Sequence, residues 1–182
     1  MLLNDVTKVI VPIKTPSLLE TDLIKLKSQC SQFMSESGGL PVYKTINKTE
    51  QFVKVKARLR KGHSQFSETF NKAFEHTSNL RQRAIFAHGQ QLTESNQYYL
   101  FPTNGFKYVY NPQIENSSIY EGVQSSVDDE VFADLLKQNY TNSMLSEGIE
   151  SGSELLFHNV PFCYAVNTGI VDSYGELLSL LK

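Results

Sequence analysis

Ile149-Glu150-Ser151-Gly152-Ser153-Glu154-Leu155-Leu156-Phe157 decides how the chain is interpreted, because it places an acid where a polar turn becomes an apolar run. Serine and glycine are typical of turns, and a short apolar run that follows them is typical of a strand. A carboxylate at the start of such a strand is held by rigid backbone and borders whatever cleft the strand lines. Glu154 is therefore an acid that can face such a cleft. The alternatives are a solvated charge at a strand edge or an ion-pair partner of Arg58 or Arg60.

The composition is that of a folded globular chain of one domain. The 182 residues are 40% hydrophobic and 20% charged, which is enough apolar material for a core and too little charge for a disordered chain. We expect a single domain over residues 1–182, in which residues 1–16, interrupted by Pro12 and Pro16, form an N-terminal arm. The net charge of -2 argues against general nucleic-acid binding.

Several classes of protein do not fit the sequence. Cys30 and Cys163 have the spacing of neither a metal site nor a redox motif, and no metal is expected. No stretch approaches the roughly 18 consecutive apolar residues of a membrane span. A basic segment followed by a long apolar run is also missing at the N-terminus, so we expect no signal peptide and no membrane association.

The periodicity of the apolar residues predicts an α+β domain that is helical first and richer in strands later. Helices are predicted from Ser17, which a Ser or Thr would cap, to Gly38-Gly39, and at 64–76, 128–140, 141–149 and 173–182. Strands are predicted at 40–46, 52–59, 84–87, 97–101, 106–110, 155–158 and 162–166. Two hairpins are expected, one across 102–105, where Asn-Gly favours a tight turn, and one across 159–161. Residues 111–126 are expected to be irregular.

A series of short motifs runs through most of the chain in a recognisable order. The motifs are Leu26, Cys30 and Phe33; Val42-Tyr43-Lys44-Thr45; Ala57-Arg58-Leu59-Arg60-Lys61-Gly62; Asn71 and Phe74; Arg83-Ala84-Ile85-Phe86; Tyr98-Tyr99-Leu100-Phe101-Pro102; Gly105-Phe106-Lys107-Tyr108-Val109-Tyr110; and Ser151-Gly152-Ser153-Glu154. In this order they resemble a group of phage-type proteins with an ADP-ribosyltransferase-like core. The resemblance implies a split β core preceded by a helix.

The resemblance also implies a chemistry, in which the bond between nicotinamide and ribose of NAD is cleaved. Positive charge develops on the sugar, as in glycoside hydrolysis, and Glu154 would stabilise it. Lys44 stands where the group carries arginine and would bind the NAD phosphates or the adjoining ribose as a point charge. His88 and Arg58 would also hold NAD, and Tyr98 would stack on nicotinamide. Gly152, two residues before the acid, disfavours arginine as the modified residue.

Each of the NAD-binding candidates also has a purely structural interpretation. Lys44 would be an ordinary surface lysine, and His88, next to Gly89, a turn residue. Arg58 belongs to a basic cluster that would be a solvated turn. Tyr98 lies among aromatic residues that would form core and cross-strand pairs.

Three functions remain open at the level of sequence. The first is an NAD-dependent transferase that acts on a host macromolecule. The second is a catalytically inactive ADP-ribosyltransferase-like protein that serves as a binding or virion structural protein. The third is an inhibitor of a host defence or transcription protein, which no motif supports. All three predict a host or phage protein as partner, and the host cytoplasm or the phage particle as location.

Overall fold

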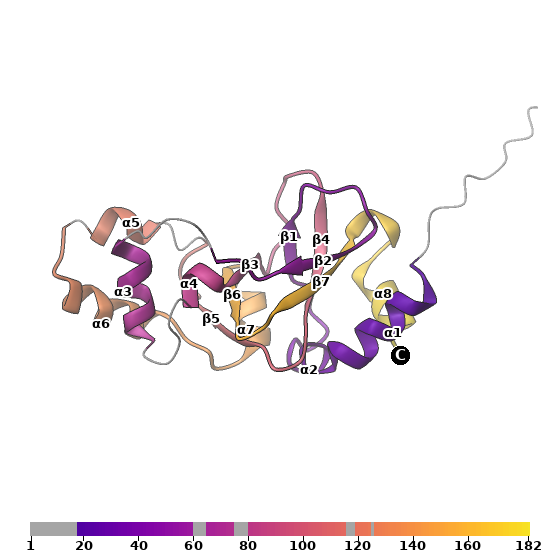
Figure 1. Cartoon of the computed structure of the whole chain (residues 1–182), viewed down its shortest axis with the longest axis horizontal. Coiled ribbons are helices and arrows are strands. Elements are labelled where there is room, and N and C mark those ends of the chain that lie inside the picture. The colour runs from indigo at the N-terminus through magenta and orange to yellow at the C-terminus, as the bar shows by residue number, and fades with distance from the viewer. Residues whose placement is uncertain (1–17, 60–64, 75–79, 116–118, 125) are drawn as a thin grey trace, which may run out of the picture.

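The computed structural model describes residues 18–59, 65–74, 80–115, 119–124 and 126–182. The predicted arm at 1–16 and Arg60 lie outside these ranges. Within them the chain forms one α+β domain, as predicted, with a seven-stranded antiparallel sheet (Figure 1). The order across the sheet is β2 (Phe52–Lys56), β7 (Phe162–Asn167), β4 (Gln97–Pro102), β1 (Tyr43–Thr45), β3 (Ile85–His88), β6 (Glu154–His158) and β5 (Lys107–Tyr110).

The described residues also form eight α-helices and one 3-10 turn at Thr168–Ile170. The helices are α1 (Glu20–Gln29), α2 (Ser31–Glu36), α3 (Gln65–Ala73), α4 (Leu80–Arg83), α5 (Ile119–Gln124), α6 (Asp129–Asn139), α7 (Leu145–Glu150) and α8 (Tyr174–Leu180). The short helix α5 lies in the stretch that was expected to be irregular, so that expectation was wrong. No helix in the described ranges is both long and apolar enough to span a bilayer.

The sheet consists of two halves that meet at a single pair of residues. The first half-sheet, β2-β7-β4-β1, and the second half-sheet, β3-β6-β5, are each held by pairs of strands with three to five residues in register. Between β1 and β3 the register comprises only Tyr43 opposite His88. We call this contact the junction. Of the strand pairs in the sheet, β1 and β3 have the fewest residues in register.

Both predicted hairpins are wrong, because the two turns connect strands of different half-sheets. After β4 the chain leaves the first half-sheet and β5 pairs with β6, and after β6 it returns and β7 pairs with β2 and β4. The Asn104-Gly105 turn does form, with Gly105 at φ 89°. Asn104 binds the corner between α1 and α2: its amide donates to the Gln29 carbonyl (2.7 Å) and its Oδ1 accepts from the Gln32 amide (3.0 Å).

The first predicted helix is divided at Cys30. This residue leaves helical geometry at ψ 18°, and its thiol lies 3.6 Å from the Phe101 carbonyl, to which it donates. The predicted Ser or Thr cap was also wrong, since the N-cap is Leu19 and no side chain caps it. Gly38 and Gly39 take positive φ and end α2, as predicted.

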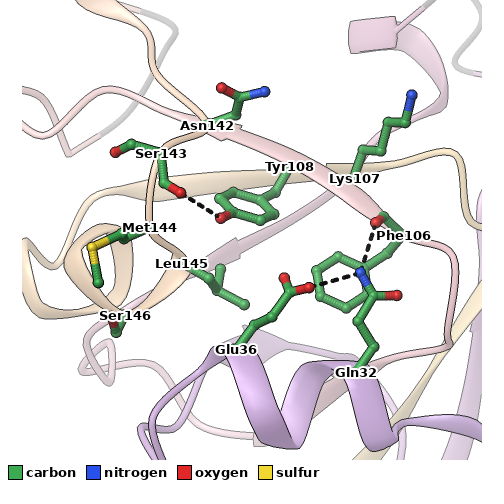
Figure 2. A pocket seen from close by; sticks show the side chains of 10 residues that line it. All are labelled: Gln32, Glu36, Phe106, Lys107, Tyr108, Asn142, Ser143, Met144, Leu145 and Ser146. Carbon is green, nitrogen blue, oxygen red and sulfur yellow. Dashed lines mark hydrogen bonds between the residues drawn. The ribbon is translucent and has the colours of Figure 1, made fainter.

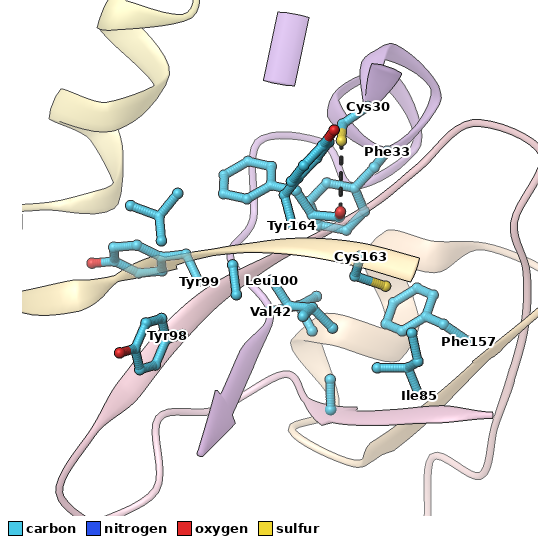
Figure 3. Close-up of a cluster of buried hydrophobic side chains, with 14 of the residues drawn as sticks. Cys30, Phe33, Val42, Ile85, Tyr98, Tyr99, Leu100, Phe157, Cys163 and Tyr164 are labelled. Carbon is cyan, nitrogen blue, oxygen red and sulfur yellow. Dashed lines mark hydrogen bonds between the residues drawn. The ribbon is translucent and has the colours of Figure 1, made fainter. Parts of the chain in front are cut away.

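Two apolar clusters hold the elements together. The larger one lies between the half-sheets and α1, α2 and α8, and contains Phe33, Leu100 and Phe157 among others (Figure 3). The smaller one packs α3, α4 and α6 on Phe86 and Leu156 of the second half-sheet. Helices α3, α5 and α6 therefore lie at one end of the molecule, and α1 and α8 at the other (Figure 1). The junction lies between them.

Candidate functional site

A hollow of about 370 Å³ opens at the junction. A volume of this size falls in the range of small-molecule sites. Its lining comes from β1, from β3 and from the segments that follow β3 and β5: Lys44, Thr45, Phe86, His88, Gln90, Leu92, Glu94 and Glu115. Two of the predicted NAD-binding residues, Lys44 and His88, are thus in one hollow although they are 44 positions apart.

Lys44 links the two half-sheets through its side chain. Its Nζ donates to the Phe86 carbonyl on β3 at 2.6 Å. A charge-assisted hydrogen bond of this length holds the Lys44 ammonium beside β3, across the gap between β1 and β3. The lysine is therefore a structural link as well as a positive charge that lines the hollow.

Glu154 lies directly opposite His88 in the register of β3 and β6. Opposed residues of an antiparallel pair project to the same face of the sheet, so the carboxylate and the imidazole are neighbours. Glu154 is only 8% exposed. Burial lowers the pKa of His88, the negative charge of Glu154 opposes this effect, and the positive charge of Lys44 adds to it. Lys44, His88 and Glu154 thus form one electrostatically coupled group.

The turn that carries Glu154 is rigid, as its sequence predicts. Ser151 Oγ donates to the Gly148 carbonyl at 2.8 Å and lies 3.0 Å from Ser153 Oγ. Gly152 has φ 73°, a conformation that favours glycine. The Gly89 amide donates to the Ser153 carbonyl at 3.3 Å and ties the turn to the end of β3. The strand β6 begins at Glu154, so the backbone that carries this carboxylate is held by strand pairing.

Gly89 allows α7 to approach β3 closely. A Cβ at this position would collide with the backbone of Ile149, including its carbonyl oxygen. α7 runs directly into the Ser151–Ser153 turn, so this close contact lies just before the segment that leads to Glu154. The sequence analysis noted Gly89 only as the neighbour of His88, and the sequence gave no signal of this contact.

Tyr98 and Arg58 are not part of the hollow. Tyr98 is fully buried, and its hydroxyl donates within reach of two carbonyls, those of Lys48 (3.0 Å) and Glu50 (2.8 Å). Its ring offers no surface on which nicotinamide could stack. Arg58 is exposed beyond the end of β2, with β7 and β4 between that strand and β1. The structural interpretations of these two residues fit their positions.

None of the acidic residues that line the hollow was a predicted site residue. Glu94 precedes β4, Glu115 follows β5, and Gln90 follows β3. Only the tertiary path of these connections brings them to the junction, and no local pattern marks them. Among the described residues, no group of three metal-ligating side chains is found, and the residues of the hollow do not suggest a metal centre.

The chain was compared with protein-family models, with curated proteins and with solved structures, and none of them matches it. The geometry of the junction is therefore the basis for a functional assignment.

Proposed function

We propose that the protein is an NAD-dependent ADP-ribosyltransferase with an ADP-ribosyltransferase-like split β core, which modifies a host macromolecule. One observation supports the proposal: Lys44 and His88 line one hollow, and Glu154, which is not itself in the lining, lies opposite His88 on the next strand. A cation, an imidazole and a buried acid on three adjacent strands form an arrangement that can bind a dinucleotide and stabilise positive charge.

The roles follow from the chemistry of the three side chains. In the transfer, the bond between ribose and nicotinamide breaks, nicotinamide leaves with the bonding electrons, and a nucleophile of the acceptor loses a proton and forms the new bond to the sugar. The Glu154 carboxylate would stabilise the positive charge that develops on the sugar. The Lys44 ammonium would attract the phosphates, and His88, kept neutral by burial, would hydrogen-bond a ribose hydroxyl.

Isothermal titration calorimetry with NAD tests binding first. We expect micromolar affinity that falls at least about tenfold in Lys44→Met, because a charge-assisted contact to phosphate is lost. Incubation with labelled NAD and host lysate then tests transfer. Label that is transferred by the native chain and not by Glu154→Gln supports the proposal; label that Glu154→Gln transfers equally well contradicts it.

A second function is favoured by particular features of the same site. Glu94 and Glu115 give the hollow an acidic wall that repels phosphates, and the Lys44 ammonium is engaged by the Phe86 carbonyl. These features suit an inactive ADP-ribosyltransferase-like binding or virion structural protein, in which the junction has only a structural role. Calorimetry that detects no NAD binding, together with stoichiometric recovery of the protein in purified particles, would establish this alternative.

A further inference from the structure

A second and larger depression lies at the far edge of the second half-sheet. Its volume is about 520 Å³, and it separates α2 from the segment that leads into α7 (Figure 2). We call it the α2–α7 trough. Its lining residues are Gln32, Glu36, Phe106, Lys107, Tyr108, Asn142, Ser143, Met144, Leu145 and Ser146. β6 and β3 separate its strand, β5, from the junction, so the trough is distinct from the proposed NAD site.

The floor of the trough is aromatic and apolar. Phe106 and Tyr108 lie with ring centroids 6.1 Å apart, and Leu145 lies beside them (Figure 2). Phe106 and Leu145 are buried, whereas Tyr108 is half-buried and retains accessible ring surface. The Tyr108 hydroxyl lies 3.5 Å from the Ser143 carbonyl, which holds the ring across the width of the trough. A half-buried aromatic ring with accessible surface is a platform for a flat or cationic group.

The walls carry negative charge close to this ring. Glu36, on α2, accepts from Gln32 Nε2 at 3.0 Å, and this bond directs its carboxylate toward the trough (Figure 2). Glu147 is not a lining residue, and its carboxylate lies 3.5 Å from Oγ of the lining residue Ser143. Burial raises the pKa of Tyr108, and the negative charges of Glu36 and, to a smaller extent, Glu147 act in the same direction.

Lys107 is the cation among the lining residues, and in the described part of the chain it forms no ion pair that would neutralise the Glu36 carboxylate. It is exposed, and its ammonium points away from Glu36 in Figure 2. Within the described residues, no ion pair joins Lys107 to Glu36 or Glu147. The negative wall and the aromatic floor are therefore open to a cation from outside the chain.

We propose that the α2–α7 trough binds an arginine side chain presented by an extended segment of a partner protein. A guanidinium is flat, stacks on aromatic rings, is less strongly hydrated than an ammonium, and pairs with carboxylates through two parallel hydrogen bonds. Tyr108 supplies the stacking surface, the buried Phe106 ring packs against it, and Glu36 supplies the carboxylate. The trough is open at the surface, so the peptide backbone can lie along its rim. The inference does not depend on NAD or on transferase activity.

The test uses two peptides that differ only in charge, acetyl-Ala-Arg-Ala-amide and acetyl-Ala-citrulline-Ala-amide, titrated into the ¹⁵N-labelled full chain. We expect millimolar binding of the arginine peptide, with amide shifts concentrated at residues 106–108 and 143–146. The citrulline peptide should bind at least about threefold more weakly, because it lacks the cation but keeps the shape. Equal affinities, or shifts located elsewhere, would overturn the proposal.

Three variants assign the contacts. Glu36 is exposed, so Glu36→Gln should fold normally and bind the arginine peptide about threefold more weakly. Tyr108→Leu keeps an apolar side chain and should lose the preference for arginine over citrulline. Glu130→Gln, on the distant helix α6, is the matched control and should bind as the native chain does. Native affinity in Glu36→Gln, or an equal loss in Glu130→Gln, would show that the trough does not recognise the cation.

Discussion

Glu154 is the first residue of β6 and lies opposite His88 on β3. A turn rich in serine and glycine followed by an apolar run predicted a strand start, and β6 begins at this residue. What the sequence could not provide was its neighbour, because the register that sets Glu154 opposite His88 depends on two strands that are more than 60 positions apart. The local sequence was enough to predict that an acid begins a strand, but it was not enough to predict which side chains surround that acid.

Replacement of Glu154 by glutamine should separate charge from shape. We expect Glu154→Gln to retain the fold and to reduce transfer of label from NAD by about a hundredfold or more, since the stabilising charge is removed. Glu150→Gln, an exposed acid at the end of α7, is the control and should leave transfer unchanged. A stable, folded Glu154→Gln protein with native transfer would exclude this carboxylate from the chemistry.

His158 should make stability depend on pH. It is 9% exposed, its Nδ1 has no hydrogen-bond partner among the described residues, and burial, followed by the charge of Lys107 opposite it, lowers its pKa from 6.5 to about 4. The unfolded chain therefore takes up the proton first as the pH falls. Stability should be fully present above pH 6.5 and should decrease toward pH 4, by about 2 kcal/mol between pH 7 and pH 5.

Urea denaturation at pH 7 and pH 5 measures this decrease. In His158→Gln the decrease should become smaller. It should not vanish, because burial also lowers the pKa of His88 and acts in the same direction. If the native chain and His158→Gln lose the same stability between the two pH values, the buried imidazole is not the source.

At the scale of elements, the packing of α7 on β3 depends on the absence of a side chain. Gly89→Ala would drive a methyl group into the Ile149 backbone, and backbone cannot move as easily as the end of a side chain. We expect a loss of about 2–4 kcal/mol in the free energy of unfolding and displacement of the Ser151–Ser153 turn. Denaturant unfolding gives the first quantity, and the amide shifts of the turn give the second.

Gly122→Ala is the matched control for this substitution. A Cβ at Gly122 meets no heavy atom within 4 Å, and alanine is the better residue within a helix. Gly122→Ala should therefore leave stability unchanged or raise it by up to about 1 kcal/mol. A Gly89→Ala protein as stable as Gly122→Ala would mean that α7 can move away from β3 at little cost.

The elements also show where local patterns are sufficient and where they fail. Asp128, whose carboxylate accepts from the Glu130 amide, begins α6 as its sequence predicts, and Ser173 begins α8 in the same way. Turn chemistry identified the Asn104-Gly105 turn but not the partners of the strands beside it. A tight turn fixes the direction of the chain over four residues. Strand pairing is decided by burial across the whole sheet, and this is why both hairpin predictions failed.

At the scale of the whole molecule, the junction is the weak point of the sheet and the place of the candidate site. A single register pair and the Lys44 side chain connect the half-sheets through β1 and β3. Lys44→Met should therefore lower the free energy of unfolding by about 1–3 kcal/mol, through the loss of the charge-assisted hydrogen bond to the Phe86 carbonyl. Differential scanning calorimetry should show a lower melting temperature.

Lys56→Met, on the exposed edge strand β2, is the control. Its free energy of unfolding should lie within about 0.5 kcal/mol of that of the native chain. The stability measurement also separates the two functional proposals. A lower melting temperature with no change in NAD affinity would mean that Lys44 is a structural link alone. A native melting temperature in Lys44→Met would remove the argument that this side chain braces the junction.

The interleaved path of the chain has a consequence for biosynthesis. Among the described strands, β2 pairs only with β7, which begins more than 100 residues later. The pairing of β3 with β6 also requires a strand that is synthesised much later. Neither half-sheet can be completed before β6 and β7 have been synthesised. β1 can pair with β4 early, whereas β2 lacks its partner β7 until the final third of the chain is synthesised, and contacts of such large sequence separation favour slow folding. Nascent chains of this protein are thus obvious clients for chaperones that shield exposed strand edges.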